Sequence, residues 1–252
     1  MNLDGLYRYL NVIAYKRDRY RLRREKKQNL SFVAMFHNVV ADEGEIGGDP
    51  YAITVENLTR FLDACGERGY TFASVEDVFC SGADRSKNRV VMTFDDGFES
   101  IYTLVDPLLR SRNIPYTVFE TTENLGKAGY LTAPMLREIA ESPVAAVGMH
   151  ADRHLMYRYE SDACLMRNYE RCCARIEEIT GKRPVHFAFP YGSMYAVSRR
   201  NMKTVKKLGA KTVFLTRQHK LNAKEIRLAD AIPRLNVPGW YNKTEKVAGI
   251  EL

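Results

Sequence analysis

The sequence predicts an α/β fold in which parallel strands are covered by helices, behind a helical N-terminal extension. Short runs rich in β-branched and aromatic residues alternate with helical patterns, which is typical of parallel sheets. The chain has 252 residues, a length that suits one domain of α/β-barrel size or two small domains. Because no internal repeat, low-complexity tract or Gly/Ser linker interrupts the alternation, we expect one domain over residues 30–252.

Eight runs have the composition of strands, and five segments between them have helical periodicity. The predicted strands are 31–36, 70–73, 89–94, 116–120, 145–149, 185–189, 211–216 and 232–237. The predicted helices lie at about 54–68, 98–112, 132–141, 157–180 and 195–208. Two segments between these elements, 42–49 and 125–130, are expected to be loops that are long enough to shape a site.

The positive charge of the chain is concentrated at its N-terminus. Residues 1–29 contain nine basic and three acidic residues and so carry +6 of the net charge of +7. Leu3, Leu6 and Leu10 repeat there at helical spacing. A basic amphipathic helix can pack on its own domain or lie on an anionic membrane, and both interpretations stay open. Nucleic acid is disfavoured as a partner because the body lacks zinc-finger spacing, Gly-rich RNA motifs and a basic aromatic stripe.

Cysteine usage and hydropathy favour a cytoplasmic protein, with peripheral membrane contact through residues 1–29 as the open addition. The five cysteines are an odd number at scattered positions, which argues for a reducing compartment and against a disulfide framework. No apolar run approaches the length of a membrane span, and the N-terminus lacks the features of a secretion signal.

Polar side chains gather immediately after several predicted strands, whereas the strand starts carry no such cluster. These residues are His37, Asp95, Asp96, His150, His154 and Tyr191, together with Arg234, which follows Ile232 by two residues. Since parallel barrels build active sites at the carboxyl ends of their strands, we expect these side chains to line one shared site. For Asp95-Asp96-Gly97 alone, an ordinary surface turn is the alternative, because Asp and Gly are common turn residues.

The spacing of His150 and His154 is the sharpest local signal for a metal. Residues four apart lie on one face of a helical turn, so both imidazoles can point the same way. Two histidines and one carboxylate from another strand form a three-ligand site with open positions, as in catalytic zinc sites. A pair of surface histidines at this spacing by chance is the alternative.

Three ordered motifs resemble those of the polysaccharide deacetylase family, carbohydrate esterase family 4, over about residues 32–238. TFDDG at 93–97 matches its first motif, GMHADRH at 148–154 resembles its second, GSH(T/S)xxH, and FAFPYG at 187–192 is similar to its third. Met149 and Ala151 depart from the second motif outside the ligand positions. The layout is closest to poly-N-acetylglucosamine-type deacetylases, because FHNVV at 36–40 resembles their N-terminal YHxV segment.

The resemblance implies a distorted (β/α) barrel that removes acetyl groups from N-acetylated sugars with one divalent metal ion. Zinc is the expected ion, with nickel, cobalt or manganese as alternatives. Carried over by motif, Asp95 is the general base, and the metal ligands are Asp96, His150 and His154. Tyr191 supplies a backbone N–H to the developing oxyanion.

Two features depart from the family pattern. Ala188 stands where many members carry an arginine that braces the base, and Arg234 is the candidate replacement, with an ordinary salt bridge as the alternative. The late Leu-x-x-His segment that usually supplies the general acid has a different spacing before His219. We therefore favour His37 as the acid, with a buried structural histidine as its alternative role. His186 precedes its strand and so lies at the opposite end from the other candidates.

The expected function is a metal-dependent hydrolase that removes the N-acetyl group from an amino sugar in a surface glycan, exopolysaccharide or lipid-linked precursor. One alternative is hydrolysis of another amide, such as an N-formyl sugar or a cyclic amide, with the same metal site. A second alternative is a glycan-binding relative without turnover, which the intact Asp95 disfavours, because a binding module needs no base beside a metal.

Overall fold

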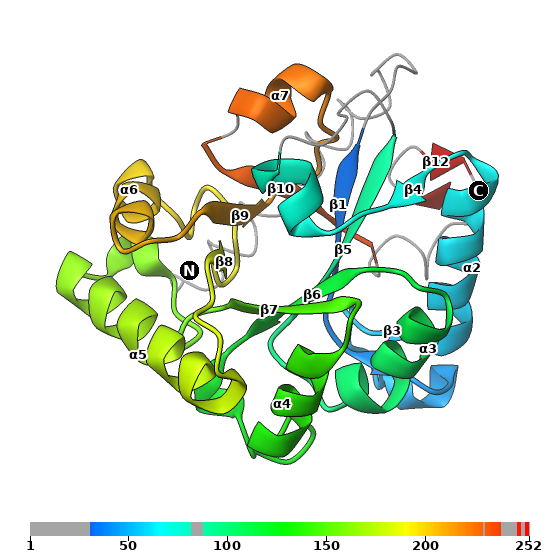
Figure 1. Cartoon of the computed structure of the whole chain (residues 1–252), viewed down its shortest axis with the longest axis horizontal. Coiled ribbons are helices and arrows are strands. Elements are labelled where there is room, and N and C mark those ends of the chain that lie inside the picture. Colours follow the sequence, from blue (N-terminus) through cyan, green and yellow to red (C-terminus); the bar gives the residue numbers. More distant parts are fainter. Residues whose placement is uncertain (1–30, 82–87, 229, 238–245, 248–249, 252) are drawn as a thin grey trace.

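Parallel strands close into a barrel with helices around it, as the sequence predicts (Figure 1). The structure, a computed structural model, describes residues 31–81, 88–228, 230–237, 246–247 and 250–251. In order of pairing, the seven strands of the ring are β1 (Phe32–Phe36), β10 (Ile232–Asn236), β9 (Thr212–Thr216), β8 (His186–Ala188), β7 (Ala145–Met149), β6 (Tyr116–Glu120) and β5 (Arg89–Asp95). The ring closes where β5 pairs with β1, and β4 (Thr71–Phe72) pairs with the start of β5. All these pairs are parallel, so the carboxyl ends of the strands meet at one mouth.

Helices cover the outside of the barrel (Figure 1). They are α2 (Val55–Glu67), η3 (Ile101–Val105) with α3 (Asp106–Ser111), α4 (Ala133–Glu141), α5 (Asp162–Thr180), α6 (Arg199–Lys207) and α7 (Ala223–Leu228). Four of them begin after a hydroxyl residue that accepts the backbone N–H three residues further along. These N-caps are Thr54, Thr132, Ser161 and Ser198. A cap of this kind satisfies one of the free N–H groups of a first turn, and so it fixes where the helix starts.

The caps also explain where the predicted helix boundaries were wrong. The predicted helices at 157–180 and 195–208 begin later, at 162 and 199, because Ser161 and Ser198 cap them. The predicted helix at 98–112 divides into a wide turn, η3, and α3.

Several short elements were not predicted, because a few residues are too short a run to show periodicity. They are α7, β2 (Val39–Val40), β3 (Ile53–Thr54), β11 (Lys246–Val247), β12 (Ile250–Glu251), η1 (Glu43–Ile46), η2 (Glu76–Cys80) and η4 (Thr122–Asn124). The first part of the predicted helix at 157–180 forms a separate short helix, η5 (Tyr157–Tyr159).

Apolar side chains fill both the barrel and the layer between the barrel and its helices. One cluster contains Val33, Val91, Phe119, Ala188 and Phe214, which come from five strands of the ring and so face its interior. A second cluster packs α2, α3 and α4 against the strands, and a third does the same for α5 and α6. Because these side chains are closely packed, the strand ends at the mouth of the barrel are held rigidly.

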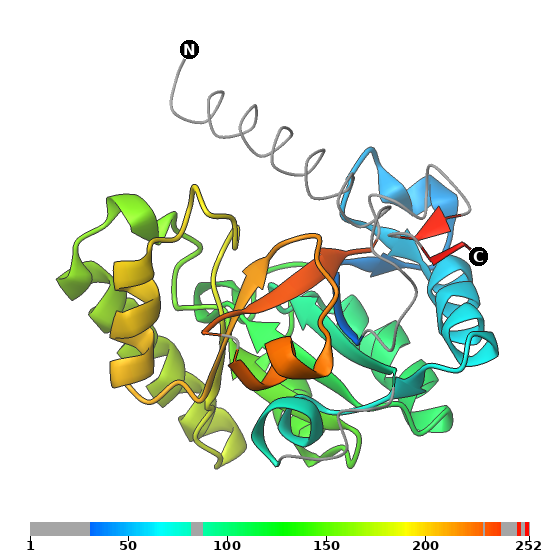
Figure 2. The same cartoon turned by 90° about the horizontal axis from the view of Figure 1, so that it is seen from above.

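The predicted extension at residues 1–29 lies outside the described residues. Its helix, its boundary at residue 30 and its membrane contact therefore stay predictions. Among the helices that the structure describes, none is both long enough and apolar enough to cross a membrane. Figure 2 shows the barrel turned by 90°, with the segments that follow β1 and β8 rising on the same side.

Candidate metal and catalytic site

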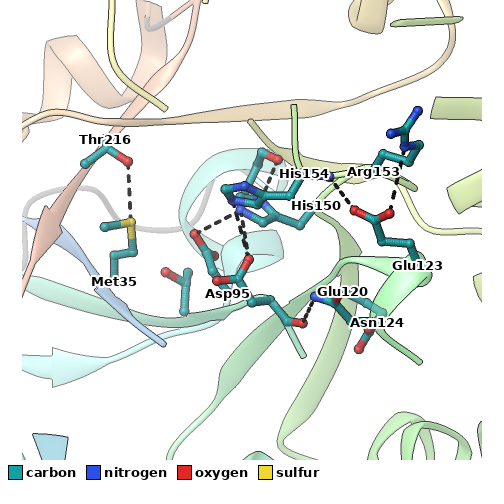
Figure 3. Close-up of polar contacts among 12 residues, drawn as sticks. Met35, Asp95, Glu120, Glu123, Asn124, His150, Arg153, His154 and Thr216 are labelled. Atoms are coloured by element: carbon teal, nitrogen blue, oxygen red, sulfur yellow. Dashed lines mark hydrogen bonds and ion pairs between the residues drawn. The ribbon is translucent and has the colours of Figure 1, made fainter. Parts of the chain in front are cut away.

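A left-handed turn at the end of β5 lets two adjacent carboxylates serve one site. Asp95 is the last residue of β5, and Asp96 leaves the strand at a φ of 71°, followed by Gly97 at 73°. In a regular strand, neighbouring side chains face opposite sides, so without this turn the pair would diverge. Position 97 must also be glycine, because a Cβ there would collide with the carboxyl group of Glu120. Figure 3 shows Asp95 with His150 and His154 on the neighbouring segment after β7.

Asp96, His150 and His154 form a compact set of metal-ligand atoms. The Nε2 atoms of both histidines lie 3.6 Å from Oδ1 of Asp96. The three ligand atoms all lie within 4.8 Å of one another. Nδ1 of His150 lies 2.8 Å from the carbonyl oxygen of Ala188 and donates to it, which leaves the lone pair of Nε2 facing the carboxylates.

This set of residues fits a divalent cation. Within the described part of the chain, Oδ1 of Asp96 is buried and has no hydrogen-bond partner. A buried, unsatisfied carboxylate oxygen is costly unless a cation or donor meets it. Two imidazole nitrogens and one carboxylate oxygen are the ligands of three-residue catalytic zinc sites.

Burial governs the protonation of these ligands. It lowers the pKa of His150 to about 3, against the opposing charge of Asp95, and it also lowers the pKa of His154. Burial, with the charge of Asp95, raises the pKa of Asp96 to about 6. Both imidazoles are therefore neutral at neutral pH, which is the form that binds metal. A bound cation would favour the ionised form of Asp96.

Asp95 is held by Arg234, which is fully buried in the middle of β10. Two hydrogen bonds of 2.6 Å join the guanidinium to the two carboxylate oxygens. The guanidinium also stacks over Phe119 and Phe214, with its central carbon 5.3 and 6.0 Å from the ring centroids. Burial alone would raise the pKa of Asp95, but Arg234 and His150 outweigh it and lower that pKa to about 2. The structure thus brings together the two residues that the sequence nominated as base and brace.

His37 lies on the β1 side of the mouth. It directly follows β1, and within the described residues its buried Nδ1 has no hydrogen-bond partner. After burial, the charge of His37 is the largest influence on the pKa of Asp96, which it lowers. The hydroxyl of Ser100 donates a hydrogen bond of 2.8 Å to the side chain of Asn38 and accepts one of 3.2 Å from the N–H of Val39, so Ser100 holds the segment that follows His37. The imidazole therefore lies within electrostatic reach of the metal set.

Tyr191 reaches the site from the end of β8. Its ring centroid lies 4.5 Å from that of His154, and its backbone adopts a φ of 60°. The next residue, Gly192, accepts a hydrogen bond of 2.8 Å from the N–H of Thr216, and a Cβ on Gly192 would collide with Thr216. The end of β9 therefore fixes the turn that carries Tyr191.

The two other histidines are held away from this set. Nε2 of His219 lies 3.0 Å from Oε1 of Glu225 on α7. His186 begins β8, where its Nδ1 lies 2.8 Å from the hydroxyl of Thr212. These positions agree with the preference for His37 over His219 and with the exclusion of His186, although the role of the acid stays a prediction.

Sequence reasoning missed Glu120, the last residue of β6. Its side chain is fully buried, and neither carboxyl oxygen has a hydrogen-bond partner in the part of the chain that the structure describes. Burial, and next the charge of Asp96, raise the pKa of Glu120 well above its usual range. The available signal was a charged residue that ends an apolar strand.

The fold and the site define a barrel hydrolase with a candidate metal centre, and comparisons with known proteins refine this class. A family model described as polysaccharide deacetylase matches residues 82–213, just over half of the chain. The chain therefore belongs to the polysaccharide deacetylase family. No curated protein is a significant match to the sequence.

Solved structures share the fold over most of their length. IcaB from Ammonifex degensii is 21% identical with a TM-score of 0.75, and the match covers 90% of this chain and 99% of IcaB. A de-N-acetylase from Aggregatibacter actinomycetemcomitans is 19% identical with a TM-score of 0.74, and the shares covered are 88% and 98%. The Streptococcus pyogenes deacetylase PplD, in complex with acetate, is 18% identical with a TM-score of 0.71 and shares of 82% and 92%.

Proposed function

We propose that this protein is a metal-dependent hydrolase that removes the N-acetyl group from an amino sugar in a surface glycan, exopolysaccharide or lipid-linked precursor. The observation that carries the proposal is the pairing of Asp95 with Arg234 directly beside the ligand set Asp96, His150 and His154. The family supports deacetylation, and the similar structures include a de-N-acetylase and a deacetylase with bound acetate.

Asp96, His150 and His154 would hold the metal ion. When bound, a divalent ion supplies a water of lowered pKa, toward ~7, and polarises a carbonyl oxygen. The hydrogen bond from His150 to the carbonyl of Ala188 fixes the ring in the tautomer that presents Nε2 to the ion. Zinc is the ion that we propose, because the two nitrogen ligands and one carboxylate match its preferences.

Asp95 would take a proton from the attacking water. Arg234 holds it in the ionised form, and each carboxylate oxygen keeps a second lone pair beyond its bond to the guanidinium. The neighbouring His150, with its Nε2 3.7 Å from Oδ2 of Asp95, places this base at the edge of the metal set. The water oxygen adds to the acetyl carbon as Asp95 receives the proton.

His37 and Tyr191 would complete the reaction on the two sides of the mouth. The oxyanion needs a donor, and a backbone N–H at Tyr191 is a group of the kind that contributes ~3 kcal/mol to such transition states. The carbon–nitrogen bond then breaks, and the leaving amine takes a proton from His37. The products are acetate and a free amino sugar, so the protons and the bonds balance.

Acetate release from a panel of N-acetyl sugars, measured with metal-loaded and chelator-treated protein, tests the proposal. We expect release with at least one sugar, loss of release after chelation, and recovery when zinc is returned. An N-formyl sugar and a cyclic amide in the same panel test the alternative amides. Binding of a sugar without any acetate release would instead favour a glycan-binding relative.

A further inference from the structure

Two tyrosines at the mouth each lie against an imidazole of the site and leave much of their surface in solvent. Tyr51 lies with its ring centroid 4.9 Å from that of His37 and is 47% exposed. Tyr191 lies 4.5 Å from His154 and is 40% exposed. Aromatic rings beside a few convergent polar groups are typical of the lining of ligand sites.

The two rings border the mouth from different sides. Tyr191 follows β8 and Tyr51 lies in the connection after β1, and three pairing steps separate β1 from β8 around the ring. Figure 2 shows the two carrier segments, blue after β1 and yellow after β8, apart from each other on the same side of the barrel. The two rings therefore come from different parts of the rim of the mouth.

Tyr51 is fixed relative to His37 and does not sit on a loose loop. Its backbone N–H donates to Oδ1 of Asp49 over 2.9 Å. Two residues further along, the N–H of Ile53 donates to the carbonyl of Asn38 over 3.1 Å, and β3 then pairs with β2. The residue after His37 and the residues after Tyr51 are thus joined by backbone hydrogen bonds, so the two side chains keep their relation.

We propose that Tyr51 is a specificity-determining residue that stacks on the apolar face of a pyranose ring whose acetamido group reaches the metal set. A pyranose presents C–H groups on its faces, and an aromatic ring buries them with favourable geometry at low entropic cost. The inference rests on the proposed function, since it assigns the sugar that the same site would hold. Tyr51 contributes binding of the sugar, and His37 contributes the proton.

Two measurements on one set of variants test this inference. The first is calorimetric binding of an N-acetylglucosamine tetramer to zinc-loaded Asp95→Asn protein, in which turnover does not interfere. We expect Tyr51→Ala in that background to weaken binding about tenfold and Tyr51→Phe to leave it nearly unchanged, because the phenyl ring keeps the stacking face. Met166→Ala is the matched control, since Met166 is 39% exposed on α5.

The second measurement compares the tetramer with 4-nitrophenyl acetate, which has an acetyl group and no sugar. We expect Tyr51→Ala to raise KM for the tetramer about tenfold with little change in kcat, and to leave the small ester unaffected. An equal loss with both substrates would overturn the inference, because Tyr51 would then serve only to position His37. Unchanged tetramer binding in Tyr51→Ala, or no binding with Tyr51 intact, would overturn it as well. Failure of the proposed function is separate: it is the absence of acetate release by the wild type from any sugar.

Discussion

The two ends of the barrel each bury a histidine beside a carboxylate, but only one end gathers a site. At the mouth, burial lowers the pKa of His150 to about 3, and at the opposite end it lowers that of His186 to about 4. His150 faces Asp95 and Asp96 at 3.7 and 3.6 Å, with His154 beside them. His186 instead bonds to Thr212 and lies 3.8 Å from Glu76, whose side chain is 54% exposed.

This difference shows that burial and a shifted pKa do not by themselves define a functional site. His186 satisfies one ring nitrogen, and the carboxylate beside its other nitrogen, that of Glu76, is exposed enough to be solvated. His150 belongs to a set in which a buried oxygen of Asp96 has no hydrogen-bond partner among the described residues. Convergence of ligands on an unsatisfied atom is what marks the mouth.

The largest expected effect is the difference between two single variants, in which His150 or His186 is replaced by alanine. We expect His150→Ala to lose both bound zinc and acetate release, because it removes one of three ligands. His186→Ala should keep one zinc per chain and most of the activity. Metal analysis of both purified variants, with activity measured in parallel, checks this pair. Equal metal content in the two variants would show that the ligand set has been assigned wrongly.

The next effect sharpens the contrast between the two remaining histidines. We expect His37→Ala to lower turnover by ~10²–10⁴-fold, the usual range for losing an acid or base, with metal content unchanged. His219→Ala should cost little, because its Nε2 is engaged with Glu225. Both variants are to be assayed on the same N-acetyl sugar. A large loss in His219→Ala alone would transfer the acid to that residue.

Breaking the Asp95–Arg234 ion pair should lower the free energy of unfolding of the protein. Arg234→Ala strands a buried carboxylate, and we expect it to lower the free energy of unfolding by about 3–5 kcal/mol. The double variant Asp95→Asn/Arg234→Met should recover much of this loss, because no buried charge is then left unpaired. Denaturant unfolding of the single and double variants measures both values. Additive losses in the double variant would mean that the two side chains are not coupled.

The smallest effect is a pH dependence of stability at Glu120. Its pKa in the folded protein is raised by burial and then by Asp96, whereas the unfolded value is ~4.3. Above that value the folded state binds more protons than the unfolded state, so this group destabilises the fold increasingly as pH rises, until the folded pKa is passed. The slope for one proton is at most about 1.4 kcal/mol per pH unit.

Glu120→Gln should therefore gain stability relative to the wild type as pH rises from 5 to 8. The measurement is denaturant unfolding of the metal-free proteins at both pH values. Glu178→Gln is the control, since the side chain of Glu178 is 67% exposed. An identical pH slope in wild type and Glu120→Gln would show that Glu120 ionises normally in the fold.

Much of the fold was predictable because local signals and tertiary packing agree. The alternation of strand and helix patterns predicted parallel strands, and the ring strands lie within a residue or two of their predicted bounds. Two helices begin later than predicted, because Ser161 and Ser198 cap their first turns. The helix α7 was not predicted, because six residues in a polar segment carry too little periodicity.

The site was predictable as a set of residues and not as a geometry. The sequence nominated Arg234 from its place shortly after Ile232, whereas the structure puts it in the middle of β10. Its two hydrogen bonds to Asp95 depend on β10 and β5 both flanking β1, which no local pattern encodes. Glu120 was missed because it ends an apolar strand and meets Gly97 only after β5 and β6 pair. Tyr51 was missed because it lies between loop residues, and only the pairing of β2 with β3 carries it to His37.

The most direct test of the account is the turnover of Asp95→Asn with its metal content measured on the same sample. Asparagine keeps the shape of the side chain and removes its ability to take a proton. The account predicts one zinc per chain, as in the wild type, and a loss of acetate release on the order of 10²-fold or more. Near-normal acetate release at normal metal content would contradict the role of Asp95 as the base and, with it, the proposed division of labour at the mouth of the barrel.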